Sequence, residues 1–501
     1  MDDIIVDIPT LTVSDVLSVE TSGAGKAGDI IVNTPTLTIS DTARITATAT
    51  ATATNAQGGG SITLNASKMN LAGVVGVFAE TQGQAPAGTL KLNPYQNQPN
   101  LDITLFPNSQ ISASTTASGK GGDLIITAPE NINVAGNGKL AVESTGSGDA
   151  GNIQITANNL TLSDGVQISA STSASGKSGS INLNIRDNIT LTGKNTGLFA
   201  NTKPGSTGES GNITIDPQTF TIKNGAGIGV NSQGRGKGGN ISIEAGKITL
   251  DQGFITAETT SNQGGNIHLN LQDLLLMRNN SRITASAGTD NAGGDGGNIT
   301  INAPLLVAFP KENNDITANA FQGKGGNINI TTNEIFGLEF RPQQTAQSDI
   351  TASSELGVTG NVQINTPGVD PTSGIVELPA ILVDAESLVA RNICDATVIR
   401  ESSFVMTGKG GLPADSQDVI ANAPGLVEWV NRGDNENKVS VVVKPQQQSD
   451  IPQPINQRVI QQAQGWIVTA NGQVILTAEV PKTTLQKPHF IPPSCGVTTR
   501  Q

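Results

Sequence analysis

Short runs of alternating apolar and polar residues fill the chain from its start to about residue 370. One group of runs reads Gly151-Asn152-Ile153-Gln154-Ile155, then Asn159-Leu160-Thr161-Leu162, then Gln167-Ile168-Ser169-Ala170. An apolar-polar period of two is typical of β-strands with one buried side. Turn residues such as Ser163-Asp164-Gly165 separate the runs. Each group therefore predicts three short strands joined by turns.

The same group of runs returns behind a series of glycines. Successive glycines lie 26 to 34 residues apart, a period that indicates stacked repeats rather than globular domains. The twelve glycine anchors are Gly28, Gly60, Gly88, Gly122, Gly151, Gly179, Gly211, Gly239, Gly265, Gly297, Gly326 and Gly360. The stretch from anchor to third strand is nearly constant in length, whereas the Gly-rich link to the next anchor varies. Constant strands with one variable corner are typical of a coil of fixed cross-section.

The repeats predict an all-β fold: a right-handed parallel β-helix of about twelve coils with three strands per coil. Equivalent strands of successive coils would pair about 4.8 Å apart, around a core of Ile, Leu, Val and Ala. Aromatic residues make up only 3% of the chain, which suits a narrow interior. Tandem β-sandwiches would need about 100 residues per unit and are a distant alternative.

The pattern changes beyond the last anchor. We expect the β-helix over 1–370, an end-cap or transition region over 371–443, a Gln/Pro-rich linker over 444–456 and a C-terminal β-hairpin segment over 457–501. The hairpin signal is Asn471-Gly472 between two alternating runs. A bulky terminus of this kind would form a C-terminal β cap over the last coil.

A side chain able to hydrogen-bond a turn follows every anchor glycine. Stacked in register, the asparagines among them could bond one another along the axis, or each could cap its own turn. Both interpretations are structural. The candidate turn ladder consists of Asn152, Asn212, Asn240, Asn266, Asn298, Asn327 and Asn361.

Composition excludes several functions. With a net charge of −13 over 501 residues, a basic surface for nucleic acid or an anionic membrane is not expected. No apolar run is long enough to predict a membrane-spanning segment. The two cysteines, Cys394 and Cys495, are too far apart for a compact zinc motif, and they form either one disulfide or two free thiols.

No cofactor or metal site is expected. The spacing Gly23-x-Gly25-x-x-Gly28 matches a dinucleotide fingerprint, but a strand rather than a helix should follow its last glycine. The glycine-rich run at 293–297 occurs once, without the nonapeptide period of calcium-binding repeats. Adventitious Ca²⁺ binding stays open.

Many parallel β-helices cleave polysaccharides, so acidic residues along the coils are candidate catalytic groups. Glutamates follow the third strand at Glu20, Glu80, Glu143 and Glu258. Glu80 and Glu143 would lie two coils or about 9.6 Å apart, the upper edge for an inverting glycosidase. We expect no basic or aromatic residues around them, and the histidines, His268 and His489, have no evident partner. The sequence therefore predicts no catalytic residues and no enzyme, with a polysaccharide-acting lyase or hydrolase as the alternative.

The glycine-anchored repeats, with the run 402–413, the stretch Gly465–Leu476 and the terminal Pro492-Pro493-Ser494-Cys495, resemble the C-terminal part of cyanobacterial filamentous haemagglutinin-like exoproteins. These are proteins of two-partner secretion with a β-helical, pectin lyase-like shaft.

The resemblance implies a secreted or cell-surface adhesin-like shaft, exported by an outer-membrane β-barrel transporter, with surface glycans or cell-surface receptors as candidate partners. The N-terminus, MDDIIVDIPTLTV, shows no signal peptide, so a non-exported remnant of such an adhesin is a further alternative. Within the repeats, we expect any function on the variable links or on the long insertions after Gly88 and Gly326.

Overall fold

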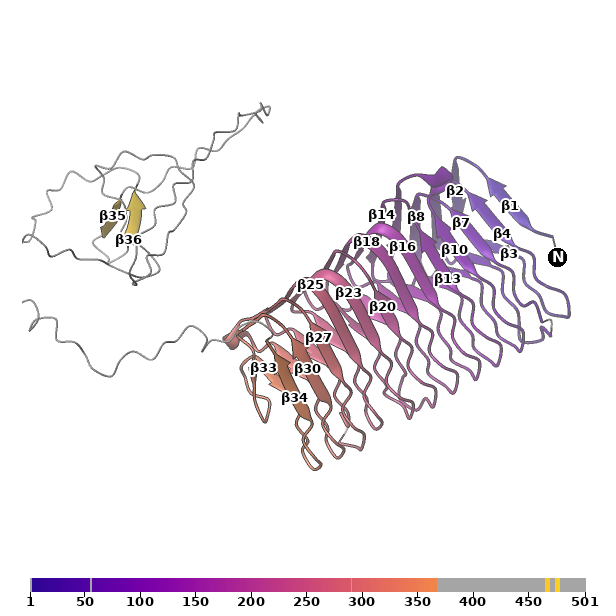
Figure 1. Ribbon diagram of the computed structural model, residues 1–501. Helices are drawn as coiled ribbons and strands as arrows, with labels where there is room; N and C mark the ends of the chain where they lie inside the picture. The colour runs from indigo at the N-terminus through magenta and orange to yellow at the C-terminus, as the bar shows by residue number, and fades with distance from the viewer. Residues whose placement is uncertain (1, 55, 290, 367–464, 469–473, 478–501) are drawn as a thin grey trace, which may run out of the picture. The chain divides into compact units, whose positions relative to one another are not determined.

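The computed structural model describes residues 2–54, 56–289, 291–366, 465–468 and 474–477. Residues 2–366 form a parallel β-solenoid of about eleven turns, with only two short 3-10 helices in this stretch. Figure 1 shows its strands side by side, each coil stacked on the one before. The structure confirms the predicted all-β stack of three-stranded coils.

Every coil places its first and second strands in one sheet of 21 strands, and all pairings in that sheet are parallel. The first strands are β1 (Ile4–Asp7), β4 (Ile30–Asn33), β7 (Ile62–Asn65), β10 (Leu90–Asn93), β13 (Leu124–Thr127), β20 (Ile213–Ile215), β27 (Ile299–Asn302), β30 (Asn327–Thr331) and β34 (Asn361–Asn365). The second strands are β2 (Thr10–Val13), β5 (Thr36–Asp41), β8 (Lys68–Gly73), β11 (Asn100–Leu105), β14 (Asn131–Gly136), β21 (Thr219–Lys223), β28 (Leu305–Ala308) and β31 (Glu334–Phe336).

In four coils the first two strands join into one long strand, a difference from the three separate runs that the sequence predicts. These are β16 (Ile153–Ser163), β18 (Ile181–Thr192), β23 (Ile241–Asp251) and β25 (Ile267–Arg278). The register shifts by one residue where β16 pairs with β18 and where β23 pairs with β25. The corner between the first and second strands is therefore a β-bulge rather than a turn.

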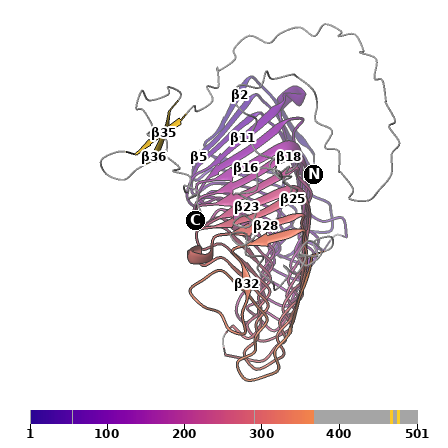
Figure 2. The same ribbon diagram turned by 60° about the vertical axis from the view of Figure 1, so that its left-hand side comes forward.

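The third strands form a separate sheet of 13 strands. Figure 2 shows strands of the 21-stranded sheet, such as β16 and β18, from another side. They are β3 (Val16–Ser18), β6 (Arg44–Thr46), β9 (Gly76–Phe78), β12 (Gln110–Ser112), β15 (Lys139–Ala141), β17 (Gln167–Ser169), β19 (Gly197–Phe199), β22 (Gly227–Gly229), β24 (Phe254–Thr256), β26 (Arg282–Thr284), β29 (Asp315–Thr317) and β33 (Asp349–Thr351). The remaining strand of this sheet is β32 (Glu339–Phe340), which belongs to an insertion.

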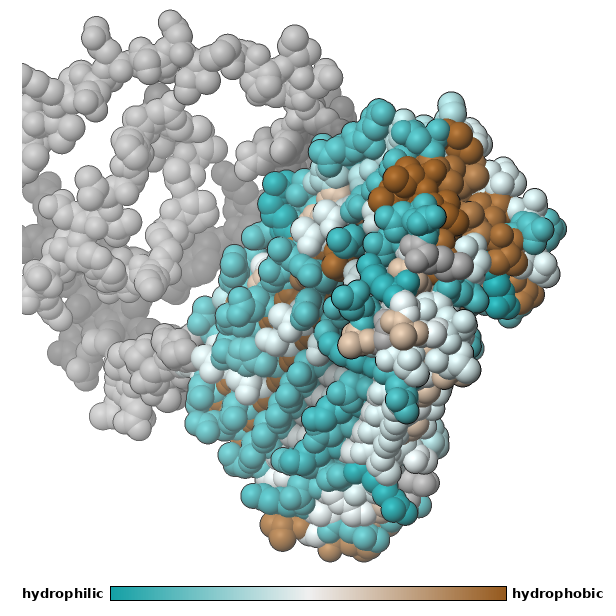
Figure 3. Space-filling model, turned by 90° about the vertical axis from the view of Figure 1, so that its right-hand side faces the viewer, coloured by the Kyte–Doolittle hydropathy of each residue, from teal (hydrophilic) through white to brown (hydrophobic). Residues whose placement is uncertain are grey.

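The main core is one cluster, mostly of Ile, Leu, Val and Ala, that runs the length of the solenoid, and three further buried alanines form a small second cluster. Phe220 is the largest fully buried side chain. At the first coil, apolar residues gather at the surface (Figure 3), where Ile5, Ile8 and Val16 are exposed. Aliphatic side chains from three short strands therefore supply almost the whole interior.

Both insertions that the sequence singled out sit between strands. The 3-10 helix η1 (Tyr95–Asn97) lies between β10 and β11, and β32 lies between β31 and β33. A second 3-10 helix, η2 (Pro310–Glu312), follows β28. Neither insertion interrupts the ladders on its two sides.

The chain divides into two units, Met1–Ile375 and Val376–Gln501. Of the second unit, the structure describes β35 (Gly465–Val468) and β36 (Val474–Thr477), which pair antiparallel, as the Asn-Gly signal predicts. The expected transition region, linker and cap otherwise lie outside the described residues. So do Cys394, Cys495 and His489.

Candidate functional site

The anchor glycines lie at the tightest point of the stack. A Cβ added to any anchor from Gly60 to Gly360 would come within 1.6 to 1.9 Å of the carbonyl oxygen of the preceding anchor. None of these glycines has a positive φ. Close approach of successive coils, rather than an unusual backbone conformation, is what requires glycine at this position.

Each anchor also forms a backbone hydrogen bond that joins the two ends of a variable link, and we call this point the neck of the link. The Gly211 N–H donates to the Ala200 carbonyl at 3.0 Å, and Gly360 bonds Ala352 in the same way at 2.7 Å. The link between these two points can change length without moving the strands. This hydrogen bond explains the constant strands and variable corner of the repeat.

The candidate turn asparagines follow the anchors, and most of their bonds go to the neighbouring coil. The Asn240 N–H donates to Asn212 Oδ1 at 2.8 Å, and Asn266 Nδ2 donates to Asn240 Oδ1 at 2.9 Å. The side-chain ladder continues from Asn266 to Asn298 and Asn327. The other members differ. Asn152 Oδ1 accepts the Ser180 N–H, and Asn361 donates its backbone N–H to the Gly326 carbonyl.

The structure contains further ladders of polar side chains that the sequence did not predict. At the start of the second strand, the amides of Asn100, Asn131, Asn159 and Asn188 bond in series over 2.6 to 3.0 Å. Three residues beyond the third strand, a buried Thr or Ser hydroxyl bonds a carbonyl inside the variable link, as Thr115 does to Gly119 at 2.6 Å. The alignment of Thr21, Thr81, Thr115, Ser144 and Thr172 in the sequence could have revealed this row.

The glutamates after the third strand lie on the outer side of the 13-stranded sheet, which we call the third-strand face. Glu80 accepts a hydrogen bond from Ser112 of the next coil, and Glu258 accepts one from Thr284. Burial raises the pKa of Glu80 above its usual 4.5, although Ser112 and Arg44 oppose the shift. Burial likewise raises the pKa of Glu258.

The expectation that no basic or aromatic residues surround these glutamates is wrong. The Arg44 guanidinium carbon lies 5.4 Å from the centre of the Phe78 ring, beside Glu80. Lys139 Nζ lies 2.6 Å from Glu143 Oε1. The Arg44 contact joins two coils, so it becomes visible only once the register is known, whereas Lys139 and Glu143 lie four residues apart in one coil.

Aromatic rings lie against glycines on the same face. The ring of Phe199 lies 2.8 Å from the place a Cβ would occupy on Gly197, and the ring of Phe254 lies 2.4 Å from that place on Gly227. Gly197 and Gly227 are paired in the sheet. Two rings therefore cover neighbouring coils. Phe78 covers Gly76 in the same manner.

A groove of about 290 Å³ runs across the third-strand face beside Phe199. Its polar lining comes from four successive coils. The lining residues are Lys139, Glu143, Gln167, Ser169, Ser171, Phe199, Asn201, Thr202, Lys203 and Gln233. An elongated molecule lying along the solenoid axis would meet polar groups at each coil.

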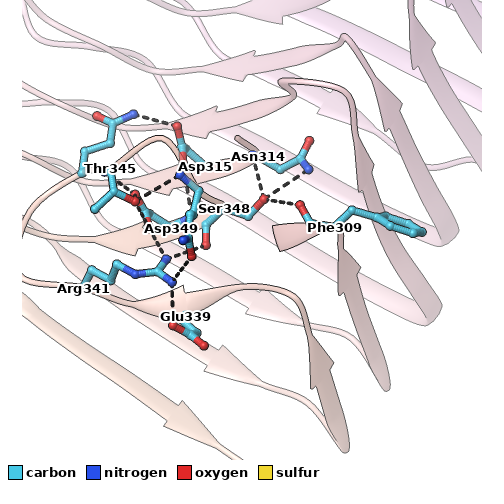
Figure 4. Close-up of polar contacts among 10 residues, drawn as sticks. Phe309, Asn314, Asp315, Glu339, Arg341, Thr345, Ser348 and Asp349 are labelled. Atoms are coloured by element: carbon cyan, nitrogen blue, oxygen red, sulfur yellow. Dashed lines mark hydrogen bonds and ion pairs between the residues drawn. The ribbon is translucent and has the colours of Figure 1, made fainter. Parts of the chain in front are cut away.

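The insertion around β32 is fixed by a buried carboxylate (Figure 4). Asp349 has no exposed surface, forms an ion pair with Arg341, and accepts a hydrogen bond from Thr345 Oγ1 at 2.9 Å. Arg341 also bonds Glu339 Oε2 at 2.6 Å. Because β32 pairs with β33, the insertion covers an edge strand of the sheet. Its polar residues hold it in place.

Two other hollows are open to solvent. One of about 560 Å³ lies beside η1 and is lined by Asn33, Asn65, Asn93 and Tyr95 among others. Another of about 990 Å³ lies beside the β32 insertion and includes Phe321 and Arg341. Both expected insertions therefore border surface hollows.

Other sequence candidates do not come together into a site. His268 is exposed on β25, and β4 begins two residues after Gly28 where a dinucleotide motif needs a helix. Within the described residues, no group of three or more His, Cys, Asp or Glu side chains could hold a metal ion. No helix in this part of the chain is long and apolar enough to cross a membrane.

No protein-family model and no curated protein matches the chain. A solved structure, the HMW1 secretion domain from Haemophilus influenzae, aligns with 72% of this chain and 96% of its own length, at 12% identity and a TM-score of 0.29. This similarity is too low to assign a function.

Proposed function

We propose that this chain is the shaft of an extracellular, adhesin-like protein of the filamentous haemagglutinin type. The observation that carries the proposal is the continuous parallel pairing of successive coils along the solenoid. It displays rows of Asn, Thr and Ser side chains to solvent around a closed aliphatic core. Such a rod suits the presentation of contacts over a distance, without catalysis.

Export by an outer-membrane β-barrel transporter completes the proposal. Antibodies against residues 2–366 should label intact cells of the source organism. Protease added outside the cells should remove this labelling. Cells lacking the transporter should retain the protein inside. Labelling only after lysis would contradict the proposal and favour the non-exported remnant.

A polysaccharide-acting enzyme is the second candidate, favoured by the carboxyl groups of Glu80 and Glu258, whose pKa burial raises. A raised carboxyl pKa is typical of a general acid in glycoside cleavage. The test is release of new reducing or unsaturated chain ends from polysaccharides. Release that Glu80→Gln or Glu258→Gln abolishes would favour the enzyme.

A further inference from the structure

The outward side of the second strands changes from polar to apolar towards the end of the solenoid. In one column of this face, threonine occupies four successive coils in register, at Thr161, Thr190, Thr221 and Thr249. The same column continues with Leu276, Val307 and Phe336. The adjacent column runs from Lys247 through Leu274 and Leu305 to Glu334. We call the outward apolar residues of these coils the apolar patch, which consists of Leu274, Leu276, Leu305, Val307 and Phe336.

The core of these coils does not need the patch. Leu275 and Leu306, which alternate with patch residues along β25 and β28, are fully buried and fill the interior. The patch residues on these two strands are only half-buried, and Phe336 is 53% exposed. Threonine satisfies the packing of the same column in four preceding coils. A contiguous apolar surface that the fold does not require is typical of a contact with another molecule.

Charged residues border the patch. On one side, Arg278 already has partners, because its Nη2 lies 2.8 Å from Glu312 Oε1 and its guanidinium carbon lies 4.0 Å from the centre of the Phe309 ring. Figure 2 shows β23, β25 and β28 side by side. Lys247 on β23 and Glu334 on β31 are exposed, and neither forms an ion pair with the residues that the structure describes. The patch therefore lies between a cation and an anion that both lack a partner.

A second copy of the chain complements this surface. The four aliphatic residues of the patch form two equivalent pairs on neighbouring strands. A twofold axis that runs parallel to the strands, midway between β25 and β28, therefore sets Leu274 against Leu305 of the second copy. It likewise sets Leu276 against Val307. The apolar residues alone fix the position of this axis.

The same rotation matches the charges. Lys247 lies one coil before Leu274 and Glu334 one coil after Leu305, in a single column, so Lys247 of each copy faces Glu334 of the other. A twofold axis parallel to the solenoid would instead set Lys247 against Thr249 and leave both charges without a partner. Charge complementarity therefore selects the axis parallel to the strands.

We propose that the apolar patch is a dimer interface through which two copies of this chain associate side by side, with their solenoid axes antiparallel. Such an interface is isologous, so it contains the Lys247–Glu334 ion pair twice. The surface from β23 to β31 spans three steps of about 4.8 Å, which places the dimer among small interfaces, below about 1,200 Å². This lateral association of two shafts goes beyond the presentation role proposed above.

The test is sedimentation velocity of the purified full chain over a concentration series that reaches roughly 0.1 mM, because an interface of this size gives a weak dimer. A reducing agent prevents disulfides between copies. The wild type should change from monomer to dimer as its concentration rises. Lys247→Glu and Glu334→Lys should each weaken the dimer about tenfold, because each sets like charges against each other twice per interface. Lys247→Glu combined with Glu334→Lys restores both pairs with the charges exchanged and should dimerise as the wild type does.

Two further variants separate dimerisation from folding. Leu276→Thr combined with Val307→Thr introduces the residue that precedes them in the column, so the circular dichroism spectrum should stay unchanged while the dimer weakens about tenfold or more. Lys91→Glu is the matched charge control and should dimerise like the wild type, since Lys91 is exposed on a first strand, β10.

A wild type that stays monomeric at every concentration would overturn the inference. The same conclusion follows from a dimer that Lys247→Glu and Lys91→Glu weaken equally, or that the exchanged charges fail to restore. Labelling of the cell surface does not depend on this association, so the two proposals fail separately.

Discussion

Replacing an anchor glycine by alanine should separate two coils. In Gly211→Ala the new Cβ would lie 1.8 Å from the Gly179 carbonyl oxygen and 2.7 Å from its carbon. An ordinary contact is 3.4 Å or more, so the two backbones must move apart by more than 1 Å. Gly211 also donates its N–H to Ala200, which ties the same residue to the neck of its own coil. Neither partner can rotate away.

The cost follows from this geometry. Overpacking a well-filled site typically destabilises by about 1–3 kcal/mol, and a backbone-to-backbone clash belongs at or above the upper end. We expect a loss of about 3 kcal/mol, felt mainly by the coils on either side because each repeat contacts only its neighbours. Gly23→Ala is the matched control, since nothing lies within 4 Å of a Cβ there, and its effect should stay within about 0.5 kcal/mol.

Urea unfolding followed by circular dichroism gives the overall loss. Hydrogen exchange of peptides covering β18 and β20 locates it. Unfolding of Gly211→Ala at the same urea concentration as Gly23→Ala, or exchange that rises evenly along the solenoid, would show that the added methyl group does not separate the two coils. A long solenoid need not unfold in one step, so the local exchange rates decide the matter.

Three further changes test the polar contacts. Arg341→Ala should lower the free energy of unfolding by about 3–5 kcal/mol, because it leaves the buried Asp349 carboxylate without its ion pair. Faster hydrogen exchange confined to β32 and β33 would show this loss, and unchanged exchange would mean that the ion pair is not needed. Glu80→Gln should make the protein more stable at pH 7. The wild-type residue, whose folded pKa is raised above 4.5, contributes its stability below pH 4.5 and loses it as pH rises through the folded value. Urea midpoints that differ by the same amount at pH 3.5 and pH 7 would contradict this. Asn266→Ala removes bonds to both neighbouring coils and should cost about 1 kcal/mol, read as a lower melting temperature, whereas an unchanged value would mean that water replaces the ladder.

The coil itself could be predicted from the sequence because its two determinants are local. Alternation of apolar and polar residues, as in Ile153-Gln154-Ile155, fixes which side of a strand is buried. The anchor glycine recurs wherever two coils touch through their backbones. A period of 26 to 34 residues then permits few arrangements besides a stack.

Contacts between coils could not be predicted, because they depend on register to the residue. Arg44 pairs with Gly76 rather than with Phe78, and the ring reaches the guanidinium only because Gly76 has no side chain. An offset of one residue would turn every side chain to the other face. The β32 insertion gives another example, since its length alone does not show that Arg341 returns to Asp349.

The stack separates positions that the fold constrains from positions that it leaves open. Anchors, necks and inward apolar residues are fixed by neighbours on both sides. At Gly211, for example, an added Cβ would lie 1.8 Å from the Gly179 carbonyl oxygen. Outward positions of the third strand are held by little besides the ladder, and accordingly they vary from Thr46 to Phe78 to Gly229. A residue that departs from its row where no steric demand exists therefore bears on function more directly than one repeated in every coil. The anchor glycines do not satisfy that criterion, because the close approach of successive coils already explains them.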